Sequence, residues 1–142
     1  MKRIHYLFAV VLVSSLTGKS IASNDNRVLV ELPDRMKQHM LSNMRDHLAA
    51  INEILVYLGN EELDKAAETA EHRLGMSSLD SHGASHMAKF MPAGMREAGT
   101  TMHKAASRFA LKAQEGELLS AYQALSNITS ACVACHSQYR VD

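Results

Sequence analysis

Two cysteines and a histidine near the end of the sequence form the pattern with the clearest chemistry. Cys132 and Cys135 are separated by two residues, and His136 follows at once. This spacing is the attachment signal for c-type haem. Each thiol adds to one vinyl group of the same porphyrin, and the imidazole after the second thiol reaches the iron as its proximal ligand. The spacing therefore predicts one covalently bound haem c with His136 on the iron.

The first residues predict export, which suits a protein whose haem is attached outside the cytoplasm. Lys2 and Arg3 precede a short apolar run, and small residues up to Ala22 suit a cleavage site. We expect a cleaved signal peptide at 1–22 and a periplasmic mature domain at 23–142. The apolar run is much too short to span a bilayer, so no membrane association is expected after cleavage.

The charge of the expected mature domain argues against one class of partner. The full sequence has 15 basic and 15 acidic residues. Removal of Lys2, Arg3 and Lys19 reduces the 15 basic residues to 12 against 15 acidic ones, a formal charge of −3. The remaining basic residues are dispersed, so no nucleic-acid partner is expected.

Apolar residues that recur at intervals of three and four predict four amphipathic helices. Pro33 suits the start of one helix and Gly59 suits its end. Pro92 and Gly116 mark the start and the end of a later helix in the same way. The predicted helices lie at about 33–59, 61–74, 92–115 and 117–139, with a poorly structured leader at 23–31 and a partly structured connection at 76–91. This order predicts an all-α fold, an antiparallel four-helix bundle with one covalently bound haem c.

The same periodicity predicts the buried side of each helix. In the first helix the expected positions are Met36, Met40, Met44, His47 or Leu48, Ile51, Leu55 and Leu58. In the second they are Leu63, Ala66, Ala67, Ala70 and Leu74. In the third they are Met95, Gly99, Met102, Ala106, Phe109 and Ala113. In the fourth they are Leu118, Tyr122, Leu125, Ile128, Cys132 and Cys135.

The haem motif at the C-terminal end of a four-helix chain resembles the cytochrome c′ family, and in particular its low-spin, six-coordinate members. Mitochondrial-type cytochromes c carry this motif near the N-terminus instead. The resemblance implies a haem between the helices, with His136 as the proximal ligand. It also implies that Arg140, one helical turn later, lies beside the porphyrin and that Tyr139 packs near the haem edge. The sixth position would be filled from the first helix.

Three methionines, one turn apart on the first helix, are candidates for that sixth position. A thioether is a soft ligand suited to haem iron, but methionine is also ordinary core filler. Met44 is the preferred ligand because its distance to the following turn is similar to that of the ligand in six-coordinate relatives. Met40 is the second choice, and Met36 is the third.

Four histidines outside the motif have two interpretations. His82 and His86, with His47 and His103, could in principle bind a metal, but a surface position for the pair at 82 and 86 is preferred. His47 alternatively lines the haem pocket or bonds a propionate, and His103 is an alternative distal ligand. A second methionine set is expected to pack in the core or against haem, with copper binding as the alternative: Met87, Met91, Met95 and Met102.

These features together predict a periplasmic electron carrier, not an enzyme. A His/Met-ligated monohaem protein exchanges single electrons with a redox partner protein. The alternative function is binding of small gases such as nitric oxide or carbon monoxide at a five-coordinate iron. A haem-dependent enzyme such as a peroxidase is a weaker third hypothesis, because His47 has no evident acid–base partner. The resemblance also leaves open a homodimer through the first two helices.

Overall fold

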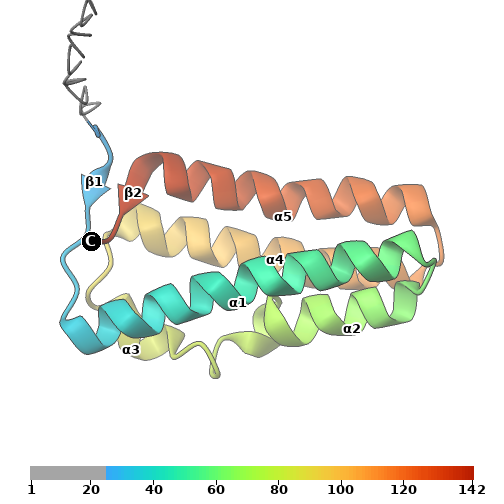
Figure 1. Ribbon diagram of the computed structural model, residues 1–142, viewed down its shortest axis with the longest axis horizontal. Helices are drawn as coiled ribbons and strands as arrows, with labels where there is room; N and C mark the ends of the chain where they lie inside the picture. The colour runs from blue at the N-terminus through green and yellow to red at the C-terminus, as the bar shows by residue number, and fades with distance from the viewer. Residues whose placement is uncertain (1–24) are drawn as a thin grey trace, which may run out of the picture.

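The computed structural model describes residues 25–142, and the fold is all-α (Figure 1). The expected signal peptide at 1–22 lies outside the described residues. Four long helices make up most of the structure: α1 (Asp34–Gly59), α2 (Leu63–Arg73), α4 (Ala93–Gln114) and α5 (Leu118–Gln138). The shorter elements are β1 (Val28–Leu29), the 3-10 helix η1 (Met76–Ser78), α3 (Ala84–Ala88) and β2 (Tyr139–Arg140).

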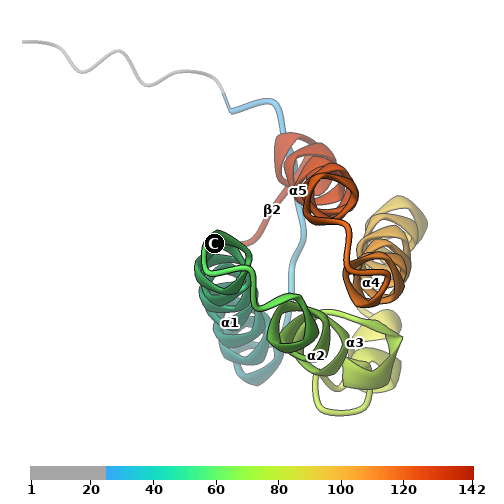
Figure 2. The ribbon, with the colours of Figure 1, turned by 90° about the vertical axis from the view of Figure 1, so that its right-hand side faces the viewer.

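The long helices lie side by side, and successive ones run in opposite directions (Figures 1 and 2). α4 packs against both α5 and α2, and α2 packs against α1. α1 and α5 touch at few points. Among residues 25–142, no helix has the length and apolar character needed to cross a bilayer.

Local signals explain most helix boundaries. Pro33 and Pro92 precede the first helical residues of α1 and α4, where a missing backbone N–H costs nothing. α1 ends at Gly59, and α4 ends two residues before Gly116, which has the positive φ of 83° that favours glycine. The predicted boundaries of these two helices are therefore confirmed to within two residues.

Small residues allow α2 to sit close to its neighbours. Ala66, Ala67 and Ala70 are almost completely buried between α1 and α4, as predicted. Large side chains from the other helices fill the space around them. The principal ones are Ile54, Leu58, Phe109 and Ile128.

The buried face of α1 agrees only in part with the predicted one: Met40, His47 and Leu58 are buried as predicted. Leu48 and Leu55 are 70% and 45% exposed, whereas Ala50 and Ile54 are fully buried. The prediction favoured the largest aliphatic residues, but the small side chain of Ala50 permits the close approach to α2. The side of α1 that packs against the core therefore includes Ala50 and Ile54, and it excludes Leu48 and Leu55.

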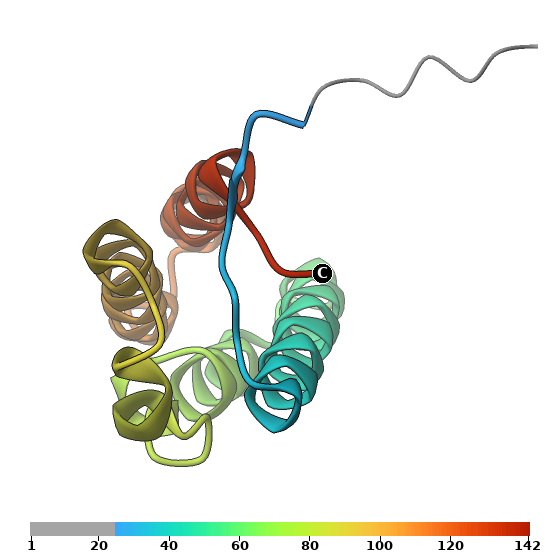
Figure 3. The ribbon, with the colours of Figure 1, turned by 90° about the vertical axis from the view of Figure 1, so that its left-hand side faces the viewer.

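The two ends of the described chain pair as a short parallel ladder, which corrects two predictions. The leader at 23–31 is not unstructured throughout, because Val28 pairs with Tyr139 and Leu29 with Arg140. Val30 is buried, and its N–H donates to the Arg140 carbonyl at 2.8 Å. Figure 3 shows the N-terminal segment crossing the end of α5.

The second correction concerns the end of α5. The helix stops at Gln138, and Tyr139 is extended (φ −126°, ψ 149°). Arg140 therefore does not lie one helical turn after His136, as predicted, but in strand β2. The ladder supplies backbone hydrogen bonds that a further helical turn would otherwise have made.

Candidate functional site

A cavity of about 380 Å³ opens at the end of the molecule where β2 passes between α5 and α1. Six of the seven residues predicted for a haem site line it. They come from α1, α5 and β2: Met40, Met44, Cys135, His136, Tyr139 and Arg140. The fold thus brings together residues that are almost a hundred positions apart in the sequence.

Cys132 is the predicted site residue that does not line this cavity. It is half-buried and packs against the hydrophobic core, one helical turn before Cys135. Both thiols are free. Burial raises the pKa of both cysteines, and the neighbouring Cys135 adds to the effect at Cys132. Both side chains are therefore neutral thiols at pH 7.

The three methionines of α1 line two different hollows. Met40 is buried and Met44 half-buried, and both line the cavity. Met36 instead lines a separate hollow beside His39 and Phe90. The second methionine set also reaches the cavity, which gives it a largely thioether and aliphatic wall: Met87, Met91, Met95 and Met102.

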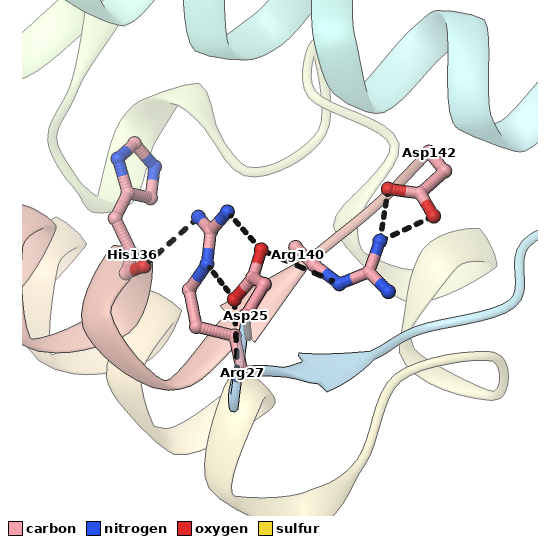
Figure 4. Close-up of polar contacts among 5 residues, drawn as sticks. All are labelled: Asp25, Arg27, His136, Arg140 and Asp142. Carbon is pink, nitrogen blue, oxygen red and sulfur yellow. Dashed lines mark hydrogen bonds and ion pairs between the residues drawn. The ribbon is translucent and has the colours of Figure 1, made fainter. Parts of the chain in front are cut away.

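Two arginines lie at the polar side of the cavity (Figure 4). Arg27 donates three hydrogen bonds to Asp25, two from its guanidinium at 2.7 and 2.9 Å and one from its backbone N–H at 3.1 Å, and its guanidinium also donates to the His136 carbonyl at 3.3 Å. Arg140 pairs with Asp142, and its Nε lies 3.6 Å from Asp25. These hydrogen bonds from Arg27 lower the pKa of Asp25 to about 2. The Nε of Arg140 is buried and has no hydrogen-bond partner.

Tyr139 is held against the start of α4. Its hydroxyl lies so close to Gly94 that a β-carbon at that position would overlap it. The aromatic ring therefore packs on a spot that only glycine leaves open. This contact places Tyr139 at the cavity wall, but nothing in the sequence signals it.

Three histidines form a cluster in the wall of the same cavity. His47 on α1, His82 in the turn before α3 and His103 on α4 have ring centroids 4.8, 5.5 and 5.9 Å apart. The surface position preferred for His82 is therefore wrong, because its ring lies between two buried histidines. The predicted surface position is confirmed for His86, which is exposed.

Burial determines the charge of this cluster. It lowers the pKa of His47 to about 4, with smaller contributions from His82 and His103. Burial also lowers the pKa of His82 and of His103. All three imidazoles are consequently neutral at pH 7. Sequence spacing paired His82 with His86 and named His47 and His103 as possible further members; the structure brings His82 together with the latter two and not with His86.

No family model, curated protein or solved structure matches this chain.

Proposed function

We propose that the chain is a monohaem c-type cytochrome, resembling low-spin members of the cytochrome c′ family, that carries single electrons in the periplasm. In this proposal residues 23–142 form an antiparallel four-helix bundle around one haem c. The observation that carries it is the single cavity in which Cys135 and His136 of α5 meet Met40 and Met44 of α1. Thiol, imidazole and thioether are the donors that such a haem needs.

The two cysteines have the arrangement that covalent attachment requires. Positions 132 and 135 are three apart on α5, so their side chains project from one side of the helix. Both are free thiols, and Cys135 already lines the cavity. Cys132 lies one turn farther along the same side and would turn from the core toward the cavity when its thioether forms. His136, at the cavity edge, would be the proximal iron ligand.

The haem, when bound, would supply a one-electron couple at its iron. The residues of α1 determine how much of the iron remains open. Met44 is the proposed sixth ligand, and Met40, which is more buried, is the second choice. A bound thioether closes the iron to other ligands and raises the reduction potential.

The arginines suit the carboxylate groups of a haem. The buried Nε of Arg140 lacks a hydrogen-bond partner, and Arg27 lies beside it at the cavity. A propionate could accept a hydrogen bond from Arg140 in a charge-assisted contact. Tyr139, held against Gly94, would form the wall next to that group.

An electron carrier of this kind needs a partner and no catalytic machinery. His136 is exposed, which leaves one side of the site within reach of a periplasmic redox partner protein. We therefore propose no enzymatic activity, no nucleic-acid partner and no membrane association after signal cleavage. A homodimer through the first two helices is compatible with this role.

The test is the visible spectrum of the purified holoprotein in its oxidised and reduced forms. Met44→Ala and Met40→Ala are matched variants, since both residues lie on α1 and line the cavity. A methionine sulfur on ferric haem gives a weak far-red band. We expect this band in the wild type and in Met40→Ala, and its loss in Met44→Ala.

Other results would change the proposal in defined ways. Loss of the band only in Met40→Ala would assign the second-choice ligand. A high-spin spectrum that shifts on addition of carbon monoxide or nitric oxide would overturn electron transfer in favour of gas binding at five-coordinate iron. Purified protein without covalently attached haem would overturn both functions.

A further inference from the structure

The cluster of His47, His82 and His103 lies in the wall of the same cavity, but none of its rings is a proposed ligand of the haem iron. One ring comes from α1, one from the turn before α3 and one from α4, and none comes from α5, which carries the cysteines. Three buried or half-buried imidazoles in mutual contact are an expensive way to fill a core, because each ring has polar nitrogens that need partners.

We infer that His47, His82 and His103 form a binding site for one divalent transition-metal cation of the Zn²⁺ class. Imidazole nitrogen is a ligand that zinc, copper and nickel prefer, whereas calcium and magnesium prefer oxygen. Three protein ligands leave the fourth tetrahedral position to a water molecule or a small anion.

The spacing of the three rings agrees with this site. With Zn–N bonds of about 2.0–2.1 Å, tetrahedral geometry places two ligand nitrogens ~3.4 Å apart and their ring centroids ~5 Å apart. The His47 Nε2 and His82 Nδ1 atoms are 3.5 Å apart. The three centroid separations are 4.8, 5.5 and 5.9 Å.

The hydrogen bond made by one ring nitrogen of His103 leaves the other nitrogen free to bind a metal. Its Nδ1 lies 2.7 Å from the Leu74 carbonyl, which can only accept, so Nδ1 carries the proton. The Nε2 atom is then left with a free lone pair. A backbone carbonyl behind the ring is a common supporting contact for a metal-binding histidine.

His82 is held in place by contacts to its backbone. Its carbonyl accepts hydrogen bonds from His39 Nε2 at 2.8 Å and Asn43 Nδ2 at 3.0 Å, both on α1. The next residue, Gly83, has a φ of 61°, and a β-carbon there would lie 3.1 Å from His39. The sharp turn at this glycine therefore directs the His82 ring toward His47.

The Ser78 hydroxyl makes a long contact with the proposed ligand atom of His82. Ser78 donates its proton to the Gly75 carbonyl at 2.7 Å, so at 3.3 Å from His82 Nδ1 it can only accept a hydrogen bond. A cation bound at Nδ1 would replace this contact, with the ring proton then on Nε2. The proposed ligands are thus Nε2 of His47, Nδ1 of His82 and Nε2 of His103.

The three rings must adjust before they can bind one ion. As the side chains stand, no three His, Cys, Asp or Glu residues within 25–142 present their donors to one point. The Nε2 of His47 and the Nδ1 of His82 are already 3.5 Å apart, so binding would require the Nε2 of His103 to move toward these two atoms. The surroundings do not oppose the charge of a cation, because Arg73 is engaged by Asp46 and Glu53.

The test is zinc binding to the purified holoprotein, measured by isothermal titration with Zn²⁺ alone and by metal analysis after gel filtration. We expect one zinc per chain, no comparable binding of Mg²⁺, and a loss of affinity of about tenfold or more in His82→Asn and His103→Asn. His86→Asn is the matched control, because this exposed histidine lies four residues from His82. It should bind zinc as the wild type does.

Several results would overturn the site. These are an absence of zinc binding, unchanged affinity in His82→Asn, and equal losses in His86→Asn. Far-UV circular dichroism checks that each variant folds. The wild type provides a measurement that needs no variant: anomalous scattering at the zinc edge should place the ion among the three rings, and a peak elsewhere would exclude it. Zinc counting is independent of the haem spectrum, so this inference and the proposed function fail separately.

Discussion

The hydroxyl of Tyr139 lies directly over Gly94, so the first turn of α4 and the strand after α5 share one tightly filled contact. A methyl group at Gly94 would force the tyrosine to move. We expect Gly94→Ala to destabilise the protein by about 1–3 kcal/mol, the usual cost of overpacking. Urea unfolding monitored by circular dichroism measures this change.

Two further variants distinguish the overlap with the Tyr139 hydroxyl from a general effect of replacing glycine by alanine. Tyr139→Phe removes the overlapping oxygen and should recover part of the loss when combined with Gly94→Ala. Gly59→Ala is the control, because no atom lies within 4 Å of a β-carbon at that position. Equal destabilisation by the two glycine replacements would contradict the proposed contact.

The corrected face of α1 can be tested at two adjacent positions. Ile54 is fully buried, whereas Leu55 is 45% exposed. We expect Ile54→Ala to lower the free energy of unfolding by about 2–5 kcal/mol, because a buried cavity remains. Leu55→Ala should cost much less, and thermal and urea unfolding would measure both. A larger loss at Leu55 would restore the face predicted from the sequence.

Arg73 connects α2 to α1 through two acidic residues. Its guanidinium lies 2.5 Å from Asp46 and 2.6 Å from Glu53, and all three side chains are partly exposed. Solvent screening limits such pairs, so Arg73→Gln should cost about 1 kcal/mol and lose part of this effect at high salt. Unfolding in low and high salt provides the measurement.

A local ion pair at the start of α2 is the control for Arg73. Lys65 and Glu62, the residue just before α2, are three positions apart and largely open to solvent, so Lys65→Gln should change stability by under ~0.5 kcal/mol. If the two variants had the same effect, the connection between α1 and α2 through Arg73 would contribute nothing of its own.

The lowered pKa of Asp25 leads us to expect that the stability of the ladder between β1 and β2 depends on pH. Its pKa falls from 3.8 to about 2 because Arg27 donates hydrogen bonds to it. A depressed carboxyl pKa stabilises the folded form above the unfolded value, and this contribution is lost as pH falls from about 4 to 2. The ladder should therefore loosen over that range.

Hydrogen exchange of the Val30 amide, which donates to Arg140, is the measurement. Asp25→Asn should give faster exchange at neutral pH and remove the part of the acid dependence that belongs to this carboxyl. Exchange in the variant that matches the wild type at every pH would show that Asp25 does not hold the ladder.

Local sequence signals predicted the four long helices but not the short elements or the contacts between distant ones. Proline and glycine marked the limits of α1 and α4, and alanine spacing marked the buried side of α2. The residues of a haem site were predicted from spacing and from a family resemblance, and all but Cys132 line one cavity.

What the sequence could not reveal depends on non-local geometry. β1 has two residues, too few for any periodic pattern, and its partner lies at the other end of the chain. The position of His82 depends on the positive φ of Gly83 and on hydrogen bonds from α1. The spacing of the histidines in the sequence therefore could not predict the position of His82.

The parallel ladder has a consequence for the order in which the protein folds. Arg27 and His136, joined by a hydrogen bond, are 109 positions apart. Closing so long a loop is entropically costly until the helices between its ends have packed, so helix pairing should precede strand pairing. During synthesis β1 must also wait for the last residues to emerge. Strand β2, which follows His136 and passes beside the cavity, is therefore expected to reach its final position only in the last stage of folding.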